Sequence, residues 1–230
     1  MNAARLDAAV KMLRNAGATV CGAVADVTQI ETLRVAIEAT IAREKRIDVV
    51  FANAGISAGP GFLACDGSRN PAAAFENLSA EMLERALATN LSGAFRTIQL
   101  VTPQMKRQGR GRIIVTTTVA VEKVETLVST LYVVSKAGLL QLVRQAALEL
   151  ARYGIRVNGI APGPVITNIG GGRLQDAGAR APFERANPMH RLATPQDIQG
   201  AALFLASSAS DYITGTQIVI DGGCSLGKAD

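Results

Sequence analysis

The chain has 230 residues and a mass of 24.0 kDa, enough for one domain with a sizeable buried core. Hydrophobic residues make up 48% and charged residues 19%, a balance that excludes a disordered chain. The net charge of +5 comes from scattered basic residues without interleaved aromatic side chains. We therefore expect no nucleic acid partner.

Membrane insertion, secretion and metal binding are also disfavoured. No apolar stretch reaches the roughly 20 residues that span a bilayer, and the N-terminus has no signal-peptide core. We therefore expect a cytoplasmic protein with no membrane partner. Cys21, Cys65 and Cys224 are far apart and odd in number, and the single histidine, His190, has no second ligand nearby. We expect neither disulfides nor a metal, and a structural role for His190.

The first part of the chain alternates between helical and strand patterns. A helix is predicted over 3–16, and the apolar run at 19–24 predicts a buried strand. A second helix, capped by Thr28, carries apolar residues along one side as far as Ile41. The short apolar run at 47–51 then predicts a buried parallel strand.

The alternation continues to the end of the chain. Segments 56–77 and 162–190 are rich in glycine and proline without a sustained apolar pattern, so we expect loops there, the least ordered parts of the protein. The whole order predicts an α/β sandwich with a parallel sheet covered on both faces. The remaining predicted elements are helices over 79–108, 130–153 and 194–206, and strands over 112–118, 155–160 and 217–220.

The most specific chemical signal is a tyrosine and a lysine four residues apart, Tyr132 and Lys136. A helix places them on one face, one turn apart. A tyrosine hydroxyl ordinarily titrates near pH ~10, and a neighbouring ammonium is expected to lower that pKa by favouring the phenolate. Such a pair can exchange a proton with an alcohol or carbonyl oxygen. Alone, it is more often a surface lysine beside a half-buried tyrosine.

Further motifs stand in a fixed order around this pair, each near a predicted strand or helix boundary. They are Asn53-Ala54-Gly55, Asn90, Thr118, Asn158, residues 162–167 and Asp221-Gly222-Gly223. Together with Tyr132 and Lys136, the set resembles the classical short-chain dehydrogenase/reductase family over essentially the whole chain. The resemblance implies one Rossmann-like domain over 1–230, doubly wound in three layers around a mostly parallel sheet. It also implies an NAD- or NADP-dependent oxidoreductase that interconverts a small-molecule alcohol and a carbonyl.

The resemblance implies a role for each matching residue. Tyr132 would be the general acid/base, and Lys136 would assist it and bind the nicotinamide ribose. Thr118 stands where the family has a substrate-orienting serine, and Asn90 matches an asparagine that holds a water in the proton relay. The residues implied to contact the cofactor are Asp26, Val27, Asn53, Ala54, Gly55, Tyr132, Lys136, Pro162, Gly163, Val165 and Thr167.

Several alternatives stay open. Asp26 could be only part of a helix cap, and Asn90 could simply bond a neighbouring backbone. The substrate could be a sugar alcohol, a hydroxy acid or a 3-oxoacyl thioester. Three arginines of the second loop could recognise a carboxylate or phosphate, or belong to a solvated lid; they are Arg173, Arg180 and Arg185.

The assembly is also an expectation from the resemblance. Members of the family are commonly tetramers that pair the helices here at 79–108 and 131–153. The long apolar ridges of these two segments permit such pairing. We therefore expect a homo-oligomer, either a homotetramer or a dimer.

The sequence departs from the family at its N-terminus. The family begins with a strand, a glycine-rich TGxxxGIG turn, a helix and a second strand, whereas residue 1 here lies at the start of the helix that follows. We therefore expect a sheet incomplete at the N-terminus, in which either strand 19–24 pairs directly with strand 47–51 or two sheet edges are left unpaired. Three hypotheses stay open. The chain could be an enzyme whose given sequence lacks a real N-terminal segment. It could instead be an inactive truncated protein that serves as a binding or oligomeric partner, or an unstable fragment.

This departure predicts weak cofactor binding. The missing turn would supply backbone N–H groups and a helix N-terminus to the pyrophosphate. Each lost charge-assisted hydrogen bond costs roughly 1.5–3 kcal/mol, and every 1.4 kcal/mol is about tenfold in affinity. Calorimetric titration of this chain with NADH and NADPH should therefore give millimolar dissociation constants. Micromolar binding of either would show that other residues form the phosphate cradle.

Overall fold

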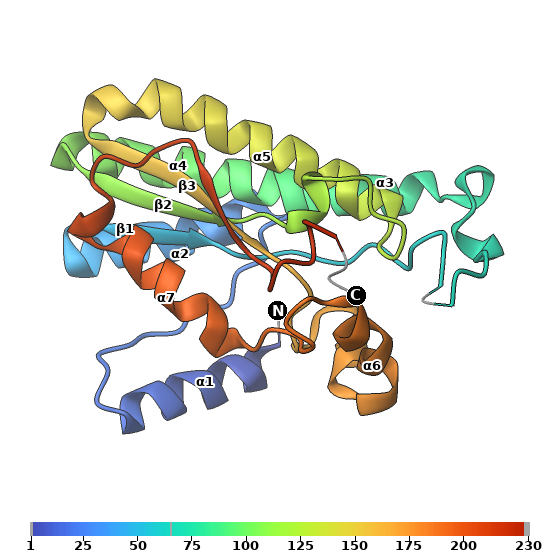
Figure 1. Ribbon diagram of the computed structural model, residues 1–230. Helices are drawn as coiled ribbons and strands as arrows, with labels where there is room; N and C mark the ends of the chain where they lie inside the picture. Colours follow the sequence, from blue (N-terminus) through green and yellow to red (C-terminus); the bar gives the residue numbers. More distant parts are fainter. Residues whose placement is uncertain (1, 65, 228–230) are drawn as a thin grey trace.

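A parallel sheet of four strands forms the centre of the computed structural model, which describes residues 2–64 and 66–227 (Figure 1). The strands lie side by side in chain order and run in the same direction. Their β-branched residues suit a pleated, buried surface. The strands are β1 (Val49–Ala52), β2 (Gly111–Thr116), β3 (Ile155–Pro162) and β4 (Gln217–Ile220).

Helices cover both faces of the sheet, which confirms the predicted α/β sandwich. One face carries α2 (Ile30–Glu44), α4 (Gly93–Gln108) and α5 (Thr130–Leu150), and the opposite face carries α7 (Pro195–Ala206) (Figure 1). The other helical segments are α1 (Ala3–Asn15), η1 (Pro71–Ala73), η2 (Phe75–Asn77), α3 (Ala80–Ala86), η3 (Leu87–Ser92), η4 (Val119–Val121), η5 (Ala151–Tyr153), η6 (Ile169–Gln175), α6 (Ala177–Ala186) and η7 (Ser208–Ser210).

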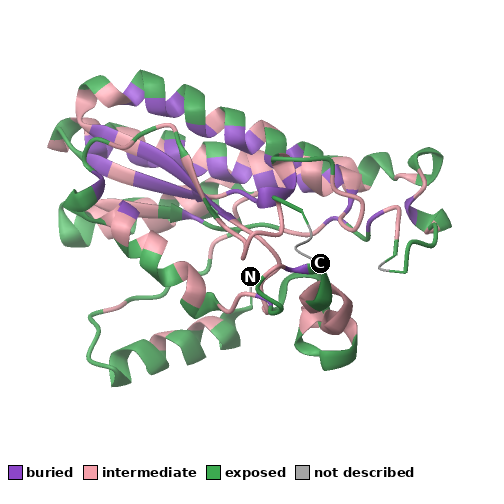
Figure 2. Cartoon of the chain, in the orientation of Figure 1, coloured by how far each residue is buried: buried purple, intermediate pink, exposed green. Residues whose placement is uncertain are grey.

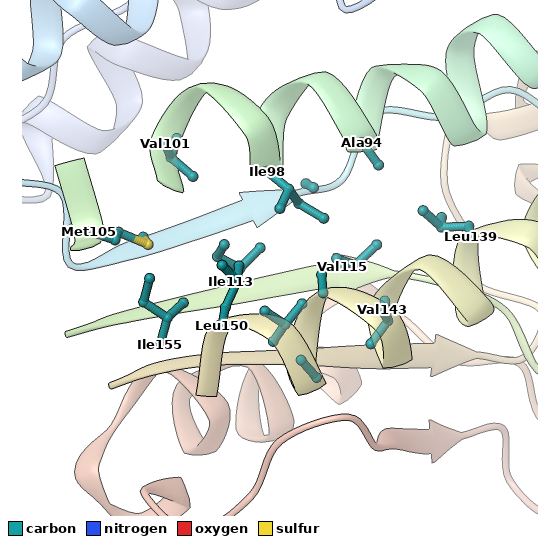
Figure 3. Close-up of a cluster of buried hydrophobic side chains, with 14 of the residues drawn as sticks. Ala94, Ile98, Val101, Met105, Ile113, Val115, Leu139, Val143, Leu150 and Ile155 are labelled. Atoms are coloured by element: carbon teal, nitrogen blue, oxygen red, sulfur yellow. The ribbon is translucent and has the colours of Figure 1, made fainter. Parts of the chain in front are cut away.

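The main core lies between α4, α5 and the sheet (Figure 3). Met105 of α4 and Val143 of α5 are buried there against Ile113 of β2. The next residue of β2, Ile114, points to the opposite face, where it packs with Leu205 of α7. The alternation along β2 thus fills both cores, while the outer sides of the helices remain exposed (Figure 2).

The predicted strand over 19–24 is wrong. Residues 18–26 form no strand, and most of them are exposed. This segment packs against α1 instead, because a Cβ added to Gly22 would lie 2.9 Å from Val10 Cγ2 and Arg14 donates a hydrogen bond of 3.0 Å to the Val20 carbonyl. An apolar run becomes a strand only where a neighbouring strand completes its ladder, and no strand flanks β1 on this side among the described residues.

Three other sequence expectations need correction. Thr28 does not cap α2, since the N-cap is Gln29 and the Thr28 hydroxyl donates to Asp26 Oδ1 at 2.7 Å. The helix expected over 79–108 is interrupted by a π-helical stretch, η3. The loop expected over 162–190 contains α6, whose apolar pattern is hidden by its glycine, proline and arginine residues.

Two of the three cysteines lie among the described residues, and both are free thiols. Cys21 is an exposed free thiol and Cys224 a partly buried one. Cys65 lies outside the described residues.

One glycine is required by the backbone at the amino end of the sheet. Gly154 has a φ of +71°, and a Cβ there would lie 2.2 Å from the Gly109 carbonyl oxygen. Gly154→Ala should therefore cost more than the roughly 1–2 kcal/mol of the left-handed conformation alone. Urea unfolding measures this free energy.

Gly200 provides the matched control for this prediction. It lies inside α7 with nothing within 4 Å of an added Cβ. Gly200→Ala should stabilise the protein by up to about 1 kcal/mol, because alanine is the better helix former. Equal unfolding free energies for the two variants would contradict the analysis.

Candidate active site

The residues singled out in the sequence gather where the parallel strands end. Asn53 follows the last residue of β1, Thr118 stands two residues beyond β2, and Pro162 ends β3. Because the strands are parallel, these ends share one edge of the sheet. This edge is the usual place of ligand sites in open α/β folds.

Lys136 lies in the second turn of α5 with its side chain almost fully inside the protein. The residue is 4% exposed, and its Nζ donates a hydrogen bond of 2.5 Å to the Thr116 carbonyl at the end of β2. Burial lowers the pKa of Lys136 to about 8, because the charged form loses hydration. The ammonium is thus retained at neutral pH and anchored to a strand end.

Tyr132 stands one turn before Lys136, and its ring centre lies 6.0 Å from Lys136 Nζ. Burial raises the pKa of Tyr132 above its usual value, and a hydrogen bond with Thr118 opposes this shift. The expectation that Lys136 lowers the pKa of the tyrosine is therefore wrong for the protein alone. Burial of the phenol is the larger influence on this pKa, and the Lys136 ammonium is directed at the Thr116 carbonyl.

Asn90 lies within the π-helix η3 and is 0% exposed. Its Oδ1 accepts a hydrogen bond of 2.8 Å from the Ile56 amide, and its Nδ2 donates to the Ile56 carbonyl at 3.1 Å. The side chain therefore fixes the loop that follows β1, as the structural interpretation of Asn90 required. Helical bulges of this kind are frequent at functional sites.

Ser135 was not singled out by the sequence analysis, although it links two residues that were. Its hydroxyl donates to the Tyr132 carbonyl at 2.7 Å and accepts from Asn90 Nδ2 at 2.9 Å. The contact joins α5 to η3 across 45 residues of sequence. Its position next to Lys136 was the only signal in the sequence, and no local pattern distinguishes it from other helix serines.

The loop after β1 passes close to these side chains, and Gly55 permits the close approach. A Cβ added to Gly55 would lie 3.2 Å from Asn90 Oδ1 and 3.6 Å from Lys136 Nζ. Asn53, Ala54 and Gly55 are exposed, and Thr116 Oγ1 donates to Asn53 Oδ1 at 2.7 Å. Lys136 Nζ, Asn90 and this exposed loop therefore lie next to one another at the carboxyl edge of the sheet.

The segment 162–167 lies beside this floor, beyond the end of β3. The Gly163 amide donates to the Ile220 carbonyl at 2.9 Å, and Val165 forms a bridge with Ala193. The Thr167 hydroxyl accepts a hydrogen bond from the Ile169 amide. These contacts fix the segment to β4 and to the chain preceding α7.

Asp26 and Val27 form a separate group, held against the start of α4. The Asp26 carboxylate accepts hydrogen bonds from the Thr28 hydroxyl and amide, which hold its pKa below the usual value. The local-turn interpretation of Asp26 therefore agrees with its contacts. A Cβ added to Gly93 would lie 2.7 Å from Val27 Cγ2, so glycine permits this close approach.

Arg96 is a second residue that the sequence analysis missed. Its guanidinium donates to the carbonyls of Val27 and Thr28, at 3.1 and 2.8 Å. The contact spans nearly 70 residues of sequence, so no local pattern could indicate it. It fixes the Asp26–Thr28 turn to the same helical ridge that carries Asn90.

Comparison with known proteins agrees with this arrangement. A family model described as enoyl-(acyl carrier protein) reductase matches residues 1–225. L-Rhamnose 1-dehydrogenase (NAD(P)(+)) of Azotobacter vinelandii is 33% identical over 211 residues, which cover 90% of this chain and 76% of that protein. None of the described helices is both long and apolar enough to cross a membrane.

Solved structures show the same relationship. A short-chain type dehydrogenase/reductase from Mycobacterium marinum superposes with a TM-score of 0.81 at 29% identity, covering 95% of this chain and 81% of that one. A gluconate 5-dehydrogenase from Burkholderia cenocepacia, solved with NADP and tartrate, gives 0.83 at 30% identity, with coverage of 98% and 83%. These relatives give no support to an inactive binding protein. The chain belongs to the short-chain dehydrogenase/reductase family and is an NAD(P)-dependent oxidoreductase that interconverts an alcohol and a carbonyl.

Proposed function

We propose that Tyr132 is the general acid/base of this oxidoreductase and that Thr118 orients the reacting oxygen. The observation that carries the proposal is the position of Thr118, which is buried two residues beyond β2 at the carboxyl edge of the sheet and close enough to the Tyr132 hydroxyl to oppose the rise of its pKa. Two hydroxyl groups converging on one point suit a substrate alcohol or carbonyl oxygen. The raised pKa keeps Tyr132 protonated at neutral pH, so it is ready to donate a proton to a carbonyl.

Bound NAD or NADP supplies or accepts the hydride. In the proposal, Asn53, Ala54 and Gly55 form the floor under the nicotinamide and its ribose, and Lys136 binds the ribose hydroxyls. The exposure of these three loop residues and the close approach of Gly55 to Lys136 Nζ support this placement. The other residues assigned to the cofactor are Asp26, Val27, Tyr132, Pro162, Gly163, Val165 and Thr167.

In the proposal, Asn90 belongs to the proton relay and acts by fixing the loop and the helix on either side of it. Its side chain fixes Ile56 and Ser135 at once, and Ser135 in turn bonds the Tyr132 carbonyl. The loop under the cofactor and the helix carrying the tyrosine are thereby held in one arrangement. Pre-organisation of this kind lowers the cost of reaching the reactive geometry.

We also infer that residues 1–230 form one domain, that the protein is cytoplasmic and that it assembles as a homotetramer or dimer. A single main core containing residues from α4, α5 and three strands supports the one-domain assignment. Large apolar side chains on the outer faces of α4 and α5, Phe95 and Leu148, are 48% and 81% exposed. They support pairing of these helices between subunits.

Tyr132→Phe tests the acid/base assignment. The variant keeps the ring but removes the proton that the reaction transfers, so turnover should fall far below one tenth of wild type. The assay follows NAD(P)H during oxidation of L-rhamnose and gluconate at millimolar cofactor, since relatives are dehydrogenases named for these two compounds. Activity within tenfold of wild type, about 1.4 kcal/mol of barrier, would refute the assignment.

Tyr153→Phe is the matched control for that variant. Tyr153 also packs partly buried beside a lysine, with Lys106 Nζ 4.1 Å from its ring centre. It lies at the far end of α5, away from the strand ends, so its hydroxyl has no part in the proposal. This variant should keep wild-type turnover.

Lys136→Met tests the burial of the ammonium. Below pH 8 both folded and unfolded wild type carry the charge, so the folded state bears the full cost of burying it. Between pH 8 and the usual lysine pKa near ~10.4, the folded protein has released a proton that the unfolded chain still binds, and stability rises with pH. The unfolding free energy of wild type, relative to that of the variant, should therefore rise by roughly 3 kcal/mol between pH 7 and pH 11.

Urea unfolding of both proteins across this pH range makes the measurement. Other groups titrate equally in the two proteins, so they cancel in the difference. The lost bond to the Thr116 carbonyl adds a term that does not depend on pH. A difference that stays constant with pH would show that Lys136 is hydrated in the folded protein.

A further inference from the structure

A small cavity of about 110 Å³ lies between the loop after β1, the chain before α5 and the η6–α6 segment. Its apolar walls include Pro60, Leu63, Leu127 and Phe183. Its polar lining includes the amide of Asn70 and the side chain of Arg173. A cation on an otherwise apolar wall indicates a site for a negatively charged group.

Two residues that line the cavity also contact the chain that leads into α5, the helix of the proposed site. Pro60 forms a bridge with Val128, and the Leu63 amide donates to the Thr126 carbonyl at 3.1 Å. The same loop places Ala58 in a buried cluster with Leu131, against which Tyr132 packs. The loop that lines the cavity thus also packs against the turn of α5 that carries Tyr132.

Arg173 differs from the other two arginines of this segment. Among the described residues, its side chain has no ion pair and no hydrogen bond, and its guanidinium lies 5.5 Å from the centre of the Phe183 ring. Arg180 pairs with Glu184 at 3.1 Å. Arg185 lines a separate hollow, of about 320 Å³, together with Asp66. Of these three arginines, only Arg173 lines this cavity, where its exposed side chain lies against the Phe183 ring.

We propose that this cavity receives a carboxylate of the substrate and that Arg173 binds it, which makes the substrate a hydroxy acid or the corresponding oxo acid. The proposal rests on the function proposed above. Ligand pockets usually measure roughly 300–1,000 Å³, so this cavity takes one terminal group. A planar guanidinium matches the two oxygens of a carboxylate, whereas a doubly charged phosphate would call for more than the one cation that lines the cavity.

The test compares two probes that differ only in the proposed group. D-Galactonate and galactitol have the same carbon chain, but the first ends in a carboxylate and the second in a hydroxymethyl group. Calorimetric titration of the full chain should give at least tenfold tighter binding of galactonate, as a charge-assisted hydrogen bond provides. Arg173→Gln should abolish this preference, and Arg173→Lys should restore part of it.

Arg180→Gln is the matched control, because it removes a nearby arginine that is already paired. It should keep the preference for galactonate. Both arginines are outside the core, and thermal unfolding confirms that each variant folds. Equal binding of the two probes, no binding of either, or a preference that survives Arg173→Gln would each overturn the proposal.

The binding test and the Tyr132→Phe assay together separate failure of the carboxylate site from failure of the proposed function. If Tyr132→Phe abolishes turnover but galactitol binds as well as galactonate, only the carboxylate site is wrong. If the Arg173-dependent preference is found while Tyr132→Phe keeps full activity, the acid/base assignment fails and the anion site stands.

Discussion

The buried ammonium of Lys136 is the constraint around which this site is arranged. A charge in a low-dielectric interior is costly unless it is hydrogen-bonded, and the carbonyl of Thr116 supplies that bond at the end of β2. The contact fixes α5 relative to the sheet. Because Tyr132 lies one turn away on the same helix, its position relative to the strand ends is set by the same interaction.

A second set of contacts fixes the floor of the site to that helix. Asn90 bonds both backbone groups of Ile56 and also Ser135. The loop after β1, the π-helix η3 and α5 are thus tied by one fully buried amide. Buried polar networks are costly unless every member is paired, and these contacts pair the amide oxygen and nitrogen of Asn90. This network therefore holds the loop after β1 and the first turns of α5 in one arrangement.

The sequence predicted those parts of the molecule whose structure is decided locally or by a burial pattern. The β-branched runs of β2 and β3, the helical ridge of α4 and the Tyr132–Lys136 spacing are of this kind. Residues 19–24 show the limit, since their strand pattern had no partner strand to join. The pKa of Tyr132 was predicted in the wrong direction, because sequence spacing does not reveal that Lys136 is directed at a backbone carbonyl.

Contacts between distant segments were also beyond the reach of the sequence. Arg96 and Ser135 bond groups that are 69 and 45 residues away, and neither belongs to a motif. The helix α6 was missed because Pro182 and its glycine interrupt the apolar pattern, although Asp176 caps it with a hydrogen bond to the Ala179 amide. Asp176, a residue type that favours helix starts, was therefore the local signal for this helix in the sequence.

The edge of β1 has a consequence for the behaviour of the protein in solution. Among the described residues no strand covers this edge, and Phe51 within it is 49% exposed. Unpaired N–H and C=O groups along a strand can join a strand of another molecule, and an apolar side chain beside them strengthens that contact. With only four residues in β1, such pairing would be short and reversible. Self-association through this edge would therefore rise with protein concentration.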